Sequence, residues 1–192
     1  ETDELRKLEP ANKHLDDMLV SSIAMKDEQT FLMATPYSIL RIAFTGTDYI
    51  YDDLETTEMS FDNLTYNSFI NNRINKLYVD RKNKVVWLGT FGKGLLKSNM
   101  QDNQVKRILL DKDIYNVNGV VQDAHGYVWL TTEYHGIWKS NSNQFSSATK
   151  FSLWENSKSK GRYTIYRDRS GSLWIADDEG VVQWLNPLSN HR

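Results

Sequence analysis

Short runs of apolar and aromatic residues recur along this chain, separated by short polar turns. Three of these runs, at residues 85–90, 128–132 and 173–177, carry a tryptophan at the same place. A weaker copy at residues 31–35 has Leu32 in the place of the tryptophan. Short runs rich in Val, Ile, Tyr and Trp, bounded by Asp, Asn and Gly, are typical of β-strands, and no window shows a sustained helical period.

The runs are periodic. Trp87, Trp129 and Trp174 lie 42 and 45 residues apart, whereas the step from Leu32 to Trp87 is longer because residues 52–72 are irregular. Periods of this size indicate a repeat architecture. We predict strands at residues 22–25, 30–35, 38–44, 49–51, 74–79, 85–90, 94–98, 105–110, 119–122, 127–132, 136–140, 163–167, 172–177 and 180–185, with one more inside residues 144–154.

A polar turn joins the first and second strands of each period. Asp80, Asp123 and Asp168 lie six or seven residues before the tryptophan, and Lys26 takes this place in the first copy. An aspartate can close such a turn by accepting a backbone N–H two residues on, and a following glycine tolerates positive φ. The glycines expected at tight turns are Gly126 and Gly171 here, and Gly94, Gly136 and Gly180 before the third strands.

Four antiparallel strands in about 43 residues is the content of one β-propeller blade. We therefore predict an all-β fold, a β-propeller segment of about four four-stranded antiparallel blades. The blades are expected near residues 20–55, 73–111, 117–155 and 162–187, with the aspartate-ended strand innermost. The tryptophans would then be buried between adjacent blades. Residues 1–19 are expected to hold an outermost strand of a neighbouring or closing blade, supplied within one molecule or across a dimer.

Composition narrows the function. The chain has 192 residues, a net charge of −2 with interspersed charges, and no cysteine. It lacks the basic patch of a nucleic-acid or anionic-lipid binder and any apolar run long enough to span a membrane. Without cysteine it has neither disulfides nor zinc-thiolate sites, and we expect no cofactor. The sequence begins at Glu1 without an initiator Met, so we expect it to be a piece of a longer chain.

The repeats resemble the two-component-regulator propeller repeat. The best copies are residues 123–130 and 168–175; the second copy has Asn83 or Lys84 instead of the glycine and one extra residue. The resemblance implies a periplasmic sensor domain of a hybrid two-component system, ahead of a membrane span and a histidine kinase. In glycan-degrading gut bacteria such sensors recognise oligosaccharides. The implied partners are therefore an oligosaccharide and further blades of the parent receptor.

Catalytic and metal sites are not predicted. The four histidines lack metal-ligand spacing, and residues 89–94, which resemble a phosphate loop, align with hairpin turns in the other copies. Two alternatives stay open: calcium binding by the acidic residues at 48–55, and a carboxylate-pair glycosidase site at residues 177–179. We interpret both segments as solvated acidic turns, and the chain itself as non-catalytic.

Ligand contacts are expected on one face, from the loops between second and third strands and from those that lead into the innermost strands. Aromatic faces beside amides and charged groups suit sugar rings and hydroxyls. The candidate residues are Phe91, Lys93, Glu133, Tyr134, His135, Asp178, Glu179, Arg73 and Arg162, with Asn72, Asn116, Asn118 and Tyr163 beside them. The competing explanations are that these loops are polar because they are solvated, and that the propeller is a protein–protein scaffold or dimerisation module.

Overall fold

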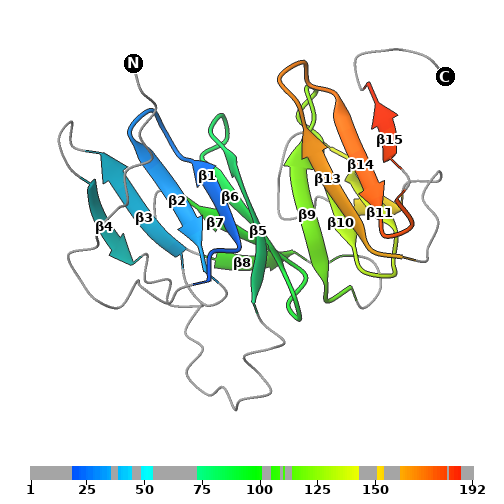
Figure 1. Ribbon diagram of the computed structural model, residues 1–192, viewed down its shortest axis with the longest axis horizontal. Coiled ribbons are helices and arrows are strands. Elements are labelled where there is room, and N and C mark those ends of the chain that lie inside the picture. Colours follow the sequence, from blue (N-terminus) through cyan, green and yellow to red (C-terminus); the bar gives the residue numbers. More distant parts are fainter. Residues whose placement is uncertain are drawn as a thin grey trace.

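The computed structural model of the protein describes residues 19–35, 39–44, 49–53, 73–100, 105–108, 110, 114–142, 151–153, 161–180 and 182–186. These residues form fifteen strands in four antiparallel sheets, which follow one another from blue to red in Figure 1. The predicted all-β architecture of four repeated sheets is confirmed. The strand expected within residues 1–19 lies outside the described residues, apart from residue 19 at its end.

Each sheet is a meander whose strands pair in chain order. The first sheet holds β1 (Ser22–Met25), β2 (Thr30–Ala34), β3 (Ile39–Phe44) and β4 (Tyr49–Asp53). The second holds β5 (Ile74–Asp80), β6 (Val85–Thr90), β7 (Leu95–Asn99) and β8 (Val105–Ile108). The third holds β9 (Val117–Gln122), β10 (Val128–Thr132), β11 (Ile137–Ser140) and β12 (Phe151–Leu153). The fourth holds the three described strands β13 (Tyr163–Arg167), β14 (Leu173–Asp177) and β15 (Val182–Leu185).

The first strands of the sheets lie together. Strand β5 packs between β1 and β9, and β13 packs on the other side of β9. The fourth strands, where described, are therefore on the outside. This arrangement confirms the prediction that the strand ending at the aspartate turn is the innermost of each sheet.

Large apolar side chains fill the joints between successive sheets. Leu32, Trp87 and Trp129 are at most 3% exposed. Leu32 shares a buried cluster with β5 and β6, Trp87 with β9 and β10, and Trp129 with β13 and β14. In the first three sheets the repeated second-strand position thus packs on the sheet that follows, and Leu32 takes the place of the tryptophan in the first joint.

The fourth sheet departs from this rule. Trp174 is 43% exposed, because no described sheet follows on the side that its indole faces. The prediction that Trp174 is buried between blades is therefore wrong. Its cross-strand partners Tyr166 and Trp184, and Val182 two residues before Trp184, are also exposed. We call these four residues the outer aromatic face.

The aspartate turns also tie the repeat together. The Oδ1 of Asp123 accepts the backbone N–H groups of His125 and Tyr127, at 3.0 and 2.9 Å. Its Oδ2 accepts the indole N–H of Trp129 at 2.8 Å, so one carboxylate holds both the turn and the joint residue. In the second sheet, Asp80 Oδ2 instead accepts a 3.0 Å bond from Gln122 of the next sheet.

The fourth sheet repeats this geometry at the surface. Hydrogen bonds from the Ser170 hydroxyl and then the Trp174 indole hold the pKa of Asp168 below its ordinary value. The second-sheet turn, which lacks the glycine, places Lys84 at φ 54° instead. In the first sheet, Asp27 rather than Lys26 supplies the turn carboxylate, since its Oδ1 accepts the N–H of Gln29 at 3.1 Å.

Candidate functional site

The two sets of loops meet at one rim of the assembly. Isolated β-bridges join Phe91 to Asn116 and Glu133 to Arg162. In each bridge, the residue that follows the second strand of one sheet pairs with the residue that precedes the first strand of the next sheet. The backbone N–H of Phe91 also donates to the carbonyl of Arg73 at 2.8 Å. The loops expected on a common face therefore come together, fixed by backbone bonds.

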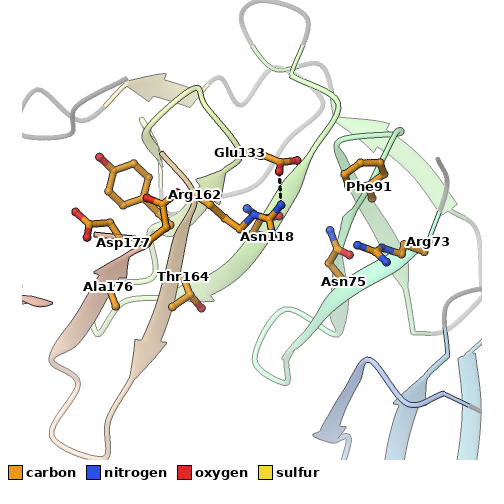
Figure 2. Close-up of a pocket in the computed structure, with 11 residues that line it drawn as sticks. Arg73, Asn75, Phe91, Asn118, Glu133, Arg162, Thr164, Ala176 and Asp177 are labelled. Carbon is orange, nitrogen blue, oxygen red and sulfur yellow. Dashed lines mark hydrogen bonds and ion pairs between the residues drawn. The ribbon is translucent and has the colours of Figure 1, made fainter. Parts of the chain in front are cut away.

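A cavity of about 370 Å³ opens at this rim, at the start of the innermost strands. Its walls come from the second, third and fourth sheets, as Figure 2 shows. The lining residues are Arg73, Asn75, Phe91, Asn118, Glu133, Arg162, Tyr163, Thr164, Ala176, Asp177 and Asp178. The walls combine two aromatic side chains with amides and charges of both signs, a composition suited to a polar ligand with some apolar surface.

A buried carboxylate holds the third and fourth sheets together beside the cavity. Glu133 is 7% exposed, and its Oε1 accepts a 2.5 Å bond from Nη2 of Arg162. Its Oε2 accepts the side-chain amide of Asn116 at 2.8 Å. The hydrogen bond and charge of Glu133 raise the pKa of Arg162. Since burying a lone carboxylate is costly, these two donors offset the cost of placing the Glu133 side chain there.

The opposite wall belongs to the second sheet. The guanidinium carbon of Arg73 lies 5.2 Å from the centre of the Phe91 ring. The amide Nδ2 of Asn75 donates to the carbonyl of Val117 at 3.3 Å. Figure 2 shows the polar ends of Arg73 and Asn75 turned toward Asn118 across the cavity. The ring contact orients the arginine without neutralising its charge.

Comparison with known proteins gives structural matches alone. No family model and no curated protein matches the chain. The extracellular domain of the hybrid two-component system BT4673 from B. thetaiotaomicron superposes with a TM-score of 0.61, 14% identity and coverage of 86% of this chain and 21% of that one. For BT3049 of the same organism these values are 0.58, 20%, 87% and 23%. The WD40 propeller domain of Doa1 gives 0.57, 8%, 88% and 52%.

The fold is a β-propeller. The four sheets are its blades, and the chain spans less than a quarter of the two-component structures that it matches. These neighbours include extracellular domains of the class that the sequence repeat resembles. The cavity lies where three propeller blades bring the starts of their innermost strands together.

The propeller brings five of the nine candidate residues to the cavity: Arg73, Phe91, Glu133, Arg162 and Asp178. The four others, Lys93, Tyr134, His135 and Glu179, do not line it. Asn118 and Tyr163, expected beside the candidates, also line it, whereas Asn72 lies outside the described residues. Sequence reasoning missed Asn75, Thr164 and Ala176, and it named Asp177 only within the acidic turn at residues 177–179. Counting from the start of each innermost strand would have found Asn75 and Thr164, because each is the second residue of its strand, as Asn118 is.

The third-blade loop places its other candidates away from the cavity. His135 Nδ1 lies 2.9 Å from the carbonyl of Glu133, and its own carbonyl accepts the indole N–H of Trp138 at 2.8 Å. Tyr134 is 62% exposed and adopts φ 66°, at the position that Gly92 takes with φ 102° in the second blade. A left-handed conformation is disfavoured for a residue with a Cβ, so Tyr134 occupies a strained backbone position.

In the part of the chain that the structure describes, no group of three or more His, Asp or Glu side chains is arranged to hold a metal ion. Nor does any helix among those residues have the length and apolarity needed to cross a membrane. The acidic segment considered for calcium lies partly outside the described residues. Asp177 and Asp178 face the cavity rather than a metal centre.

Proposed function

We propose that this propeller segment senses a ligand for a membrane-anchored hybrid two-component receptor, and that the cavity at its rim binds the ligand. The observation that carries the proposal is the cavity itself, about 370 Å³ and walled by three blades. A ligand seated there touches three blades at once, so binding changes how they are held relative to one another. The structural similarity to extracellular domains of two-component systems supports the receptor setting.

The ligand class that fits best is an oligosaccharide. Phe91 and Tyr163 offer aromatic surface, and the surrounding amides, carboxylates and guanidinium groups can exchange hydrogen bonds with hydroxyls. In this proposal the segment lies outside the cytoplasmic membrane and acts without catalysis. The signal passes to a histidine kinase elsewhere in the receptor.

Isothermal titration calorimetry of the full-length receptor against an oligosaccharide panel tests this function. We expect heat for at least one sugar, and loss of that heat in Asn118→Ala, whose side chain lies in the cavity. His135→Ala serves as the matched loop control, because His135 does not line the cavity. Absence of heat with every member of a broad panel would refute the proposal.

A protein–protein role is the second candidate, favoured by the outer aromatic face. In the first three blades the residue opposite the joint position is Arg41, Lys97 or Lys139, but in the fourth it is Trp184. In each earlier blade this surface is covered by the next blade. The exposed aromatic row of the fourth blade therefore suits packing against a further blade of the same kind, within the receptor or from a second copy. A concentration-dependent dimer whose melting temperature ignores sugars would favour this role.

A further inference from the structure

Two innermost strands carry an extra residue at the cavity. In β5, Ile74 pairs with Thr90 and Lys76 with Gly89, so Asn75 has no partner in the ladder. In β9, Val117 pairs with Thr132 and Gly119 with Thr131, which leaves Asn118 in the same position. The fourth blade has no such shift there, since Tyr163 and Thr164 pair in sequence. Bulges of this kind re-aim a side chain, and both asparagines line the cavity.

The bulge at Asn118 leaves a donor unused. Its Nδ2 is buried, and among the described residues it has no hydrogen-bond acceptor. The equivalent Nδ2 of Asn75 has one, the carbonyl of Val117 at 3.3 Å. A buried donor without an acceptor costs free energy that a ligand oxygen would recover. Asn118 therefore marks a point where the ligand presents an acceptor.

Arg73 supplies a charge at the same end of the cavity. No described carboxylate pairs with its guanidinium, which is held over Phe91 at 5.2 Å and turned toward Asn118. Arg162, by contrast, is already paired with Glu133 at 2.5 Å. Among the described residues, the second-blade end of the cavity thus offers the cation of Arg73 without a carboxylate partner and the amide donor of Asn118 without an acceptor. A guanidinium recognises a carboxylate with two parallel bonds, which a hydroxyl cannot match.

The far wall limits how acidic the ligand can be. Asp177 and Asp178, on the fourth blade, line that end. Carboxylates accept hydrogen bonds from sugar hydroxyls but repel a second acidic group. We propose that Arg73 and Asn118 bind the carboxylate of a uronate residue in an otherwise neutral oligosaccharide. This proposal rests on the sensing function proposed above and names the class of ligand at that site.

The test uses the full-length protein and matched sugar pairs. Each pair is a neutral tetrasaccharide and its copy with one terminal primary alcohol oxidised to a carboxylate, and a polyuronate chain completes the set. Calorimetry at low and moderate salt should show an acidic member that binds about 10-fold or more tighter than its neutral partner at low salt. Arg73→Gln and Asn118→Asp should each weaken that binding by about 10- to 100-fold.

The matched control is Arg107→Gln. Arg107 also lies over an aromatic ring in the second blade, 5.6 Å from the centre of Tyr115, but does not line the cavity. We expect the Arg107→Gln variant to bind both members of each sugar pair as the unaltered protein does. Equal affinities within every binding pair, or an acid preference that survives Arg73→Gln, overturn the carboxylate site while the sensing function stands. Tighter binding of the polyuronate than of the singly oxidised sugar overturns the role assigned to Asp177 and Asp178. No binding by any sugar overturns the sensing function as well.

Discussion

The same repeat position is buried in the third blade and half-exposed in the fourth, which gives a stability test with an internal control. Trp129 is 3% exposed and Trp174 is 43% exposed, yet each donates its indole N–H to a turn aspartate at 2.8 Å. Replacing a buried tryptophan with alanine costs about 3–5 kcal/mol. Scaled by the buried fraction of its surface, the same change at Trp174 costs about 2–3 kcal/mol.

The turn aspartates add to the difference in stability lost at Trp129 and Trp174. Asp123 is 3% exposed, so losing the indole donor leaves a buried carboxylate with one fewer bond, at about 1–3 kcal/mol. Asp168 lies at the surface and is resolvated when its donor is lost. We therefore expect Trp129→Ala to lower the free energy of unfolding by about 2–5 kcal/mol more than Trp174→Ala does.

Urea unfolding of both variants, followed by far-UV circular dichroism, measures this difference without relying on tryptophan fluorescence. Equal costs at the two sites would refute the reasoning, because they would mean that Trp174 is covered in solution. Sedimentation at several concentrations then separates the two explanations. A dimer would show that a second copy covers the outer aromatic face. A monomer would show that packing between blades does not determine how much stability is lost when the tryptophan is replaced.

Three further predictions concern the cavity rim and the turns. Glu133→Gln should lower the free energy of unfolding by about 1–3 kcal/mol through loss of the buried charged bond, and Glu179→Gln, at an exposed turn, by less than about 0.5 kcal/mol; equal urea midpoints would contradict this. Gly94→Ala should destabilise more than Gly180→Ala, because a Cβ at Gly94 would lie 2.6 Å from a backbone oxygen, whereas a Cβ at Gly180 would meet no described atom within 4 Å. The strain of positive φ alone is about 1–2 kcal/mol at either site, and thermal melting of both variants compares them. Because the pKa of Asp168 is lowered in the folded state, its carboxylate stabilises the fold above the unfolded-state pKa, and this stability is lost as pH falls through the folded-state pKa. The urea midpoint of Asp168→Asn should therefore fall less below about pH 4 than that of the unaltered protein. An equal fall in both proteins would argue against this.

Sequence patterning anticipated the strands because each depends on local composition. Strand β6, for example, begins and ends at the predicted residues, Val85 and Thr90. The tight turns were also predictable, since glycine or a stand-in must take positive φ there. Lys84 shows that a residue with a Cβ can fill that place at φ 54°. Repetition in register then fixed which apolar side chains face the next blade.

The cavity was less predictable, because its walls depend on the spacing between blades rather than on local pattern. The bulges at Asn75 and Asn118 each shift the pairing by one residue, a change that hydrophobic alternation does not reveal. The exposure of Trp174 was missed for a related reason. A repeat position predicts which way a side chain faces, but its burial depends on what packs against it.

The two unusual features of this propeller segment have different causes and separate consequences. At the rim, the bulges turn amide groups into a cavity and leave Nδ2 of Asn118 without an acceptor among the described residues. At the fourth blade, Trp184 replaces the lysine that lies over the joint tryptophan in the second and third blades. Because Trp174 and Trp184 do not line the cavity, a partner on the outer aromatic face need not block the ligand. It would instead hold the fourth blade, which carries Asp177 and Asp178, and so set the width of the cavity that the ligand must bridge.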